Sequence, residues 1–469
     1  MSDKNKLAFN KVLKIEQTVI PGLLILDLPV FGDNRGWFKE NWQRKKMVAA
    51  GLPDFTPVQN NISYNEKIGT TRGIHAEPWD KYVSVGRGKI FGAWVDLREG
   101  DSFGKTYAVE IDSTKAIFVP RGVGNSFQVL EDGTVYTYLV NDHWSADNND
   151  YAFLNLNDPS VAINWPLSLE SAELSDKDKV HPSLEEVKAI KPRKTLILGA
   201  GGQLGKALRE EFPEAEFADR STFDVTNPES WADRNWRQYQ TIINAAAYTK
   251  VDLAETEGRA DAWAINATAV KDLAKLATEN QLTLVHISSD YVFNGTQTIH
   301  NEDEVFSPIS VYGQSKAAGD IAAATVPNHY IIRTSWVIGE GNNFVNIMKS
   351  LAEKGVNPSV VSDQIGRLTF TQDIAKGIRH LLETNSPYGT YNLTNEGDST
   401  SWADYARKVF ELTGNDANRI SSVSTEEYYK DKTGIAPRPL QSTLDITKIK
   451  NTGLNIPTWE TRLTEYLNK

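Results

Sequence analysis

The chain has 469 residues, too many for one ordinary hydrophobic core, so two or three domains are expected. Its 40% hydrophobic and 24% charged residues are typical of a globular protein, and the net charge of −11 argues against a nucleic-acid or anionic-membrane partner. The absence of cysteine excludes disulfides and favours a reducing, cytoplasmic setting, and no segment has the roughly 18 apolar residues of a membrane span.

Short segments of alternating or continuous apolar character fill residues 1–165. The clearest are Lys81–Gly86, Ile90–Leu97, Tyr107–Ile111 and Val135–Val140. Glycine- and proline-containing turns separate them, as at Gly86-Arg-Gly88 and Pro120-Arg-Gly122. Short strands with frequent turns predict an antiparallel β sandwich or barrel.

The composition changes between residues 168 and 194, where charged residues and two prolines, Pro182 and Pro192, interrupt the pattern. We place the first domain at 1–185, a linker at 186–193 and the second domain at 194–469. Residues 1–6 lack the apolar core of a signal peptide, so they are not expected to be one.

In the second half, apolar strands alternate with helical stretches. Leu196–Leu198, Thr241–Asn244 and Thr283–Ile287 have the apolar character of buried strands, and Ala260–Glu279 has that of a helix. This alternation predicts a doubly wound parallel sheet with helices on both faces.

A glycine-rich turn lies between the first of these strands and the helix after it. The glycines fit G-x-x-G-x-x-G as Gly199, Gly202 and Gly205, or a looser pattern that uses Gly201 in place of Gly202. Such turns let the backbone approach a pyrophosphate at a helix N-terminus, as in Rossmann-type dinucleotide-binding domains. A plain strand-to-helix turn is the alternative, and the position after a strand favours the nucleotide site.

Tyr312 and Lys316 stand four residues apart, a spacing that places them on one helix face. A nearby ammonium lowers the pKa of a phenol, and we expect Lys316 to act on Tyr312 in this way. Together with the glycine turn and Ser288-Ser289-Asp290-Tyr291, the pair resembles the active site of extended short-chain dehydrogenases.

Residues 195–469 resemble the dTDP-4-dehydrorhamnose reductases in particular. The matching stretches include Gly202-Gln-Leu-Gly205, Asn244-Ala-Ala-Ala-Tyr-Thr, Ile287-Ser-Ser-Asp-Tyr-Val-Phe and Asp363-Gln-Ile-Gly-Arg. The resemblance implies that Tyr312 donates a proton to a C4 ketone, that Lys316 activates it and that Ser289 orients the substrate. Trp336 is a candidate sugar contact or a packed aromatic. The implied cofactor contacts are Gly199, Gly202, Gln203, Leu204, Gly205, Asp224, Val225, Ala245, Ala246, Ala247 and Tyr248.

Residues 10–185 resemble dTDP-4-dehydrorhamnose 3,5-epimerases, which are cupin-like jelly rolls. The resemblance rests on Phe31-Gly-Asp-Asn-Arg-Gly-Trp-Phe-Lys-Glu40, Arg72-Gly-Ile-His75, Val119-Pro-Arg-Gly122 and Leu174-Ser-Asp-Lys-Asp178. Inverting a carbon beside a ketone needs a base, a group that stabilises the enolate and an acid on the opposite face.

By this resemblance His75 is the base and Asp178 orients it, with Asp176 as a competitor for that role. Lys81 stabilises the enolate and Tyr138 returns the proton. The loop from His75 to Lys81 is shorter than the family's, which weakens the assignment of Lys81. The implied substrate contacts are Arg35, Glu40, Gln59, Asn61, Arg72, Asn125 and Lys177.

Asn125 is a departure from the family, which has histidine in the corresponding P-x-G-x-A-H-G-F motif. An amide cannot carry charge, so the sequence leaves open both the mode of substrate binding and the choice between one and two epimerised carbons. We expect no catalytic metal, because His75, His143 and His181 stand apart in the sequence.

The resulting hypothesis is a bifunctional enzyme that converts dTDP-4-dehydro-6-deoxy-D-glucose to dTDP-L-rhamnose with NADPH or NADH. Arg220 follows the predicted second strand and fits a 2′-phosphate, which slightly favours NADPH over NADH. A homodimer formed through the epimerase domain is expected. Two alternatives stay open, namely a UDP-linked sugar as substrate and a non-catalytic nucleotide-binding scaffold.

Overall fold

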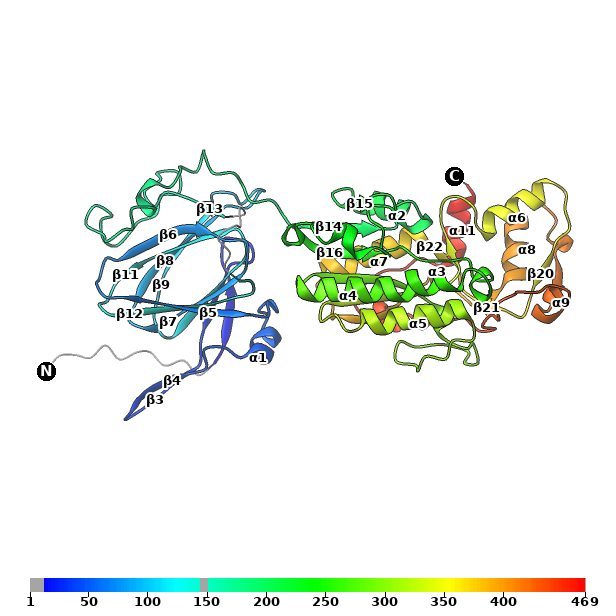
Figure 1. Ribbon diagram of the computed structural model, residues 1–469, viewed down its shortest axis with the longest axis horizontal. Coiled ribbons are helices and arrows are strands. Elements are labelled where there is room, and N and C mark those ends of the chain that lie inside the picture. Colours follow the sequence, from blue (N-terminus) through cyan, green and yellow to red (C-terminus); the bar gives the residue numbers. More distant parts are fainter. Residues whose placement is uncertain (1–11, 144–150, 469) are drawn as a thin grey trace. The chain divides into compact units, whose positions relative to one another are not determined.

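The computed structural model describes residues 12–143 and 151–468. The chain forms two compact units, Met1–Pro192 and Arg193–Lys469 (Figure 1). The expectation of two domains is therefore confirmed. Within the described ranges, no helix is long and apolar enough to cross a membrane.

The first unit is built from two antiparallel sheets. One sheet has the order β1 (Lys14–Gln17), β2 (Leu24–Asp27), β10 (Lys115–Val119), β7 (Lys81–Arg87), β12 (Thr134–Val140) and β5 (Gln59–Asn65). The other has the order β13 (Ala152–Phe153), β6 (Thr71–Ala76), β11 (Val123–Val129), β8 (Ile90–Asp96) and β9 (Thr106–Ile111). The predicted strands near residues 81, 90, 107 and 135 are all present as β7, β8, β9 and β12.

Side-chain alternation along these strands produces three apolar layers. Val83 and Val119 meet Trp94 and Phe127 between the sheets, whereas their strand neighbours point outward. The outer face of the larger sheet is covered by residues around α1 (Arg44–Ala49). Over the outer face of the smaller sheet lies the segment that follows β13, and this segment carries the short helix η1 (Asp178–Val180).

The segment before the second unit is part of this sandwich rather than free chain. Ile190 is 8% exposed, its amide donates to the Leu97 carbonyl, and its own carbonyl accepts from the Glu99 amide. An apolar side chain thus attaches the first part of the segment 186–193 to the smaller sheet. A hairpin, β3 (Val30–Asp33) and β4 (Gly36–Lys39), projects from the sandwich (Figure 1).

The second unit contains a six-stranded parallel sheet, as the alternating pattern predicts. Its order is β15 (Glu216–Ala218), β14 (Lys194–Leu198), β16 (Tyr239–Asn244), β17 (Thr283–Ser289), β18 (His329–Thr334) and β23 (Gly389–Asn392). The direction of winding changes beside β14, since β15 lies on one side of it and β16 on the other. Ligands of open parallel sheets bind at the carboxyl ends of the strands at such a point.

Helices cover both faces of this sheet (Figure 1). On one face α4 (Ala269–Glu279) and α5 (Val311–Ala323) pack over Leu196 and Ile242, and on the other α2 (Gln203–Glu211) and α7 (Thr371–Glu383) pack over Ile197 and Ile243. The predicted helix 260–279 is divided into α3 (Arg259–Trp263), a π turn (Ala264–Thr268) and α4.

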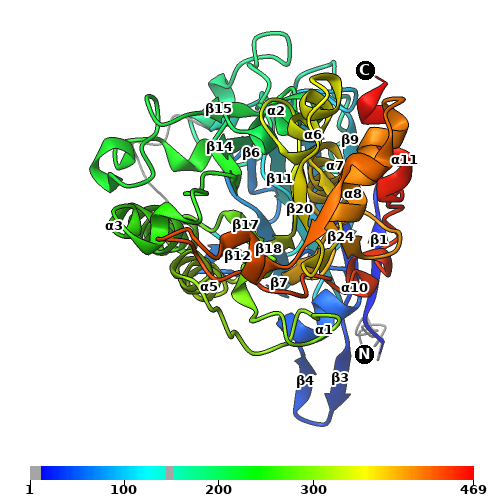
Figure 2. The same cartoon turned by 90° about the vertical axis from the view of Figure 1, so that its right-hand side faces the viewer.

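A third apolar core lies beyond the sheet, where α6 (Phe344–Glu353), α8 (Trp402–Leu412) and α11 (Trp459–Leu467) pack together. Figure 2 shows α8 and α11 side by side. The remaining α-helices are α9 (Thr425–Tyr429) and α10 (Thr447–Lys450). The remaining strands form the short pairs β19–β22 (Val337–Ile338, Thr369–Phe370), β20–β25 (Ser359–Val361, Ser421–Val423) and β21–β24 (Ile365–Gly366, Thr400–Ser401).

Candidate active sites

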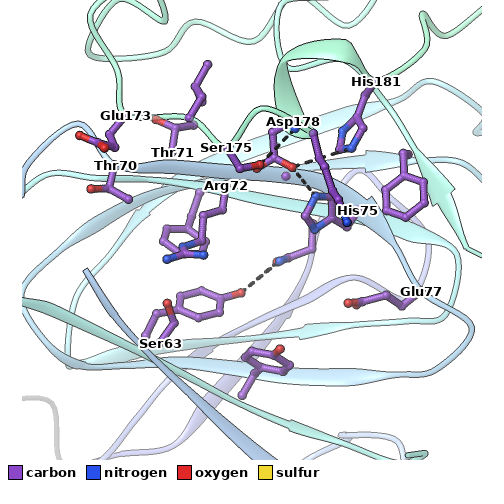
Figure 3. Close-up of a pocket in the computed structure, with 18 of the residues that line it drawn as sticks. Ser63, Thr70, Thr71, Arg72, His75, Glu77, Glu173, Ser175, Asp178 and His181 are labelled. Atoms are coloured by element: carbon purple, nitrogen blue, oxygen red, sulfur yellow. Dashed lines mark hydrogen bonds and ion pairs between the residues drawn. The ribbon is translucent and has the colours of Figure 1, made fainter. Parts of the chain in front are cut away.

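A pocket of about 1020 Å³ opens in the first unit. Strands β6, β7, β11 and β12 contribute to its lining, and so does the segment 173–181 that crosses the smaller sheet. Figure 3 shows the labelled side chains of this pocket. The lining contains both polar and aromatic groups, a combination that is typical of small-molecule sites.

His75 and Asp178 form a hydrogen-bonded pair in this pocket. Nε2 of His75 lies 2.9 Å from Oδ1 of Asp178. Burial acts to raise the pKa of Asp178, but the hydrogen bond and charge of His75 and the Ser175 hydroxyl hold it below its usual value. The competing Asp176 is fully exposed and pairs with Lys179 instead. Asp178, and not Asp176, is thus the carboxylate that holds the His75 imidazole through Nε2.

A second histidine reaches the same carboxylate. Nε2 of His181 lies 3.8 Å from Oδ1 of Asp178, and the rings of His75 and His181 are 5.3 Å apart (Figure 3). We expected the histidines not to cluster, and this is wrong for His75 and His181, because the turn of η1 brings His181 back over β6. Burial, followed by the influence of His75, lowers the pKa of His181.

Lys81 and Tyr138 lie on neighbouring strands of the larger sheet. The Lys81 amine is 5.2 Å from the centre of the Tyr138 ring and forms an ion pair with Glu77, which sequence analysis did not single out. Burial lowers the pKa of Lys81 to about 7, and burial also raises that of Tyr138 against the opposing charge of Arg72. The shorter loop before Lys81 therefore still delivers this amine to the pocket.

Asn125 occupies a fixed position in the pocket wall. Its Oδ1 accepts a 2.9 Å hydrogen bond from Nε1 of Trp94, and its Nδ2 donates to the Tyr136 hydroxyl at 3.1 Å. Both partners are buried, so the amide orientation is set by the protein rather than by solvent. Asn125 can offer hydrogen bonds to a substrate but no charge.

The expected substrate contacts fall into two groups. Arg72 and Lys177 line the pocket together with Asn125. Four others are not among its described lining residues: Arg35 at the exposed hairpin tip, Glu40, Gln59 and Asn61. Glu40 pairs with Lys46, and Gln59 donates to Asn61 along the edge strand β5.

The expected reductase residues gather at the carboxyl edge of the parallel sheet. Gly199 follows β14, Ala245 follows β16 and Ser289 ends β17. Because neighbouring strands of this sheet are parallel, these ends share one edge. The expected cofactor and catalytic residues therefore lie along one edge of the sheet.

The space around each glycine of the turn after β14 decides between the two glycine patterns, which use either Gly202 or Gly201. A Cβ on Gly199 would lie 2.6 Å from the Ala246 amide, and one on Gly205 would lie 2.3 Å from the Gly199 carbonyl. Gly199 also has a φ of +78°. No atom lies within 4 Å of a Cβ built on Gly201, so that glycine is not needed for space. Gly202 caps the N-terminus of α2.

The side chains of Leu204 and Gln203, which follow this turn, make contacts within the protein. Leu204 is buried in the core under the sheet, and the Gln203 side chain accepts a 2.9 Å hydrogen bond from the Gly339 amide. The Gln203 amide nitrogen also donates to the Asn342 carbonyl at 3.3 Å, so both side chains make contacts within the protein. After β15, Asp224 accepts hydrogen bonds from the amide and hydroxyl of Thr226, and Val225 is buried.

The turn after β16, residues Ala245 to Tyr248, is held by a buried asparagine in the π turn. Oδ1 of Asn266 accepts from the Tyr248 amide at 2.9 Å, and its Nδ2 donates to the Tyr248 carbonyl at 3.1 Å. Irregular turns within helices frequently occur at functional sites. Sequence analysis did not identify Asn266, although an asparagine inside an apolar helix was a visible signal.

Tyr312 and Lys316 lie on the buried face of α5. The Lys316 amine donates a 2.6 Å hydrogen bond to the Ile287 carbonyl, and burial lowers its pKa to about 8. Our expectation of a lowered Tyr312 pKa is wrong in this structure. Burial, reinforced by Asp290, raises the pKa of Tyr312 against the Ser289 hydroxyl. The phenol is therefore protonated at neutral pH, the form that a proton donor needs.

Two buried carboxylates beside this pair were missed. Asp290 accepts from the Ser289 hydroxyl at 2.9 Å, and burial raises its pKa to about 6. Asp320, four residues after Lys316, accepts from Arg333 at 3.0 Å and acts to raise the Lys316 pKa. Asp320 follows Lys316 by four residues, about one helical turn, and this spacing was a visible signal in the sequence.

The remaining candidate, Trp336, is packed against other aromatic rings. Its ring stacks on Trp402 at 3.8 Å between centroids, and its backbone has a φ of +46°. A non-glycine residue in this left-handed conformation is strained, and such strain concentrates at functional sites. One face of the Trp336 ring is therefore packed against Trp402, as expected for a packed aromatic.

Two family models match consecutive parts of the chain. The first, described as dTDP-4-dehydrorhamnose 3,5-epimerase, covers residues 17–186, and the second, described as RmlD substrate binding domain, covers residues 193–469. A protein named RmlC homolog from Streptococcus pyogenes is 54% identical over 180 residues, which are 37% of this chain and 90% of that protein. A dTDP-4-dehydrorhamnose reductase from Aggregatibacter actinomycetemcomitans is 36% identical over 57% of this chain and 96% of its own.

Among solved structures, a dTDP-4-dehydrorhamnose reductase from Bacillus anthracis in complex with NADP resembles the second unit. It is 35% identical with a TM-score of 0.54, and the match covers 59% of this chain and 100% of that one. The chain therefore belongs to two families at once, as a dTDP-4-dehydrorhamnose 3,5-epimerase followed by a dTDP-4-dehydrorhamnose reductase.

Proposed function

We propose that the chain converts dTDP-4-dehydro-6-deoxy-D-glucose to dTDP-L-rhamnose in two steps. The first unit inverts C3 and C5 of the keto sugar, and the second reduces the C4 ketone with NADPH. The observation that carries this proposal is the succession of the two enzyme families in one chain, each with its acid–base groups present.

In the epimerase, Nδ1 of His75 removes the proton beside the ketone. Asp178 holds the ring and stabilises the imidazolium that forms. Lys81 in its ammonium form stabilises the enolate oxygen, and the protonated hydroxyl of Tyr138 returns a proton from the opposite face. Arg72 and Lys177 supply the positive charge that a diphosphate needs.

In the reductase, the backbone of the glycine turn cradles the cofactor diphosphate. The tight space at Gly199 and Gly205 and the N-terminus of α2 fit a pyrophosphate. Bound NADPH would supply the hydride to C4. Tyr312 donates the proton to the carbonyl oxygen, Ser289 orients that oxygen, and Lys316 supplies positive charge beside the developing phenolate.

We further propose a homodimer formed through the epimerase unit. The hairpin β3–β4 and strand β5 expose Phe38 at 70%, Ile62 at 68% and Tyr64 at 63%. Exposed apolar side chains on an edge strand favour association. The position of Arg35 outside its own pocket suits a contact with a second copy. Sedimentation of wild type beside an Ile62→Lys, Tyr64→Lys variant tests this association.

The two architectures are assigned as a jelly roll and a Rossmann domain, supported by the paired antiparallel sheets and by the parallel sheet with its change in winding. We also propose a cytoplasmic location, which the lack of cysteine favours.

Product analysis tests the proposed function. Purified chain, NADPH and the dTDP-linked keto sugar should yield a product with the rhamno configuration by NMR. Competition with the UDP-linked sugar measures nucleotide preference, for which a one-methyl difference amounts to about 1–3 kcal/mol. A chain that binds both nucleotides but turns over neither would be a scaffold.

A further inference from the structure

The grouping of His75, Asp178 and His181 goes beyond what epimerisation requires. One ligand atom from each residue lies within 4.8 Å of the other two. His75 comes from β6, whereas Asp178 and His181 come from one turn around η1. Figure 3 shows both imidazoles directed at the same carboxylate.

The spacing of these atoms suits a small divalent metal ion. Zinc bound at about 2.0–2.2 Å in tetrahedral geometry places its ligand atoms roughly 3.3–3.5 Å from one another. The two nitrogen-to-oxygen distances, 2.9 Å and 3.8 Å, lie on either side of that value. Two imidazoles and a carboxylate also form a common donor set of zinc sites that keep an open position.

The proposed epimerase mechanism assigns no role to His181. Its side chain is only 10% exposed, and its Nε2 points at an oxygen that already accepts from His75. The ring is also positioned by hydrogen bonds with the backbone of Gly73 and Leu154. A buried imidazole that the backbone positions and that is aimed at a carboxylate is a ready third ligand.

We propose that His75, Asp178 and His181 bind a divalent transition-metal ion, zinc in particular, and that the bound ion switches off the epimerase. Metal binding itself does not depend on the proposed function, but its inhibitory effect does.

Proton placement explains the inhibition. In the metal-free site the proposed mechanism places the His75 ring proton on Nε2, facing Asp178, and a lone pair on Nδ1. When a metal takes Nε2, the single ring proton moves to Nδ1. The ring then has no lone pair with which to remove the substrate proton, and no proton is gained or lost overall.

Direct binding to the full-length chain tests the site without relying on activity. Zinc titration by calorimetry should show one tight site per chain, and Co²⁺ should give the visible absorption of a tetrahedral complex. His181→Ala and His181→Gln should each weaken binding by at least about tenfold. His143→Ala, which removes an exposed histidine, is the control and should bind as wild type does.

Activity then tests the consequence. Zinc should suppress solvent-deuterium exchange into the keto sugar, and EDTA should restore it, while NADPH oxidation with the already epimerised sugar continues. Equal zinc affinity in wild type and both His181 variants, with thermal unfolding showing that all are folded, would overturn the site. Tight binding without loss of exchange would overturn the inhibition alone.

Discussion

Nε2 of His75 lies 2.9 Å from Oδ1 of Asp178, although the two residues are 103 positions apart in the chain. The segment that follows β13 makes this contact possible, because it folds back over the smaller sheet and is anchored there by Leu154 and Ile190. The epimerase site is therefore completed by the last part of its own domain.

Asp178→Asn should reduce deuterium exchange at C3 and C5 by roughly 10²- to 10³-fold, because the ring loses the carboxylate that orients it and stabilises its charge. Asp176→Asn is a matched control two residues away, since its side chain is fully exposed. The exchange is measured by NMR in D₂O. Equal losses in the two variants would contradict the assignment of Asp178.

Sequence and structure agree best where a pattern depends on neighbouring residues. Alternation located β7 and β12, and the glycine turn located the start of α2, because both patterns depend only on local geometry. The proximity of His181 to Asp178 could not be read in this way, since it depends on how η1 lies over β6. The raised pKa of Tyr312 also escaped, because burial of a phenol is a tertiary property.

Tyr312→Phe should abolish NADPH oxidation and leave deuterium exchange into the keto sugar unchanged. The phenol donates a proton only at the carbonyl that is reduced, and that site belongs to the other compact unit. Both activities are followed on one sample by absorbance and NMR. Loss of exchange as well would mean that the two sites are not independent.

The rate of reduction should fall as pH rises through about 8, where Lys316 loses its proton. Its pKa is lowered by burial, and Asp320 acts in the opposite direction. Removing that carboxylate with Asp320→Asn should therefore move the fall in rate to lower pH. The exposed Asp303→Asn is the control. An unchanged profile in the Asp320 variant would exclude Lys316 as the titrating group.

Gly205→Ala should impair NADPH binding and destabilise the second unit by about 1–3 kcal/mol, because its Cβ would meet backbone that cannot move aside. Gly201→Ala has open space at the same turn and should bind NADPH normally. Fluorescence titration and thermal unfolding compare the two. Equal effects would contradict the cradle built on Gly199 and Gly205.

Division of the chain at Pro192–Arg193 should leave a more stable first fragment than division a few residues earlier. A fragment of residues 1–192 keeps Ile190 in its core, whereas a fragment of residues 1–185 loses it, at a cost of about 2–4 kcal/mol. Denaturant unfolding measures the difference. If both fragments are equally stable, the anchoring role of Ile190 is wrong.

The central claim is that one chain epimerises and then reduces the same sugar, and a single reaction in D₂O tests it most directly. The keto sugar nucleotide and unlabelled NADPH are incubated with the purified chain, and the product is analysed by mass spectrometry and NMR. We expect dTDP-L-rhamnose with deuterium at C3 and at C5 and with hydrogen at C4. NADPH consumption that yields an unlabelled D-sugar, or a labelled keto sugar that is never reduced, would contradict the account.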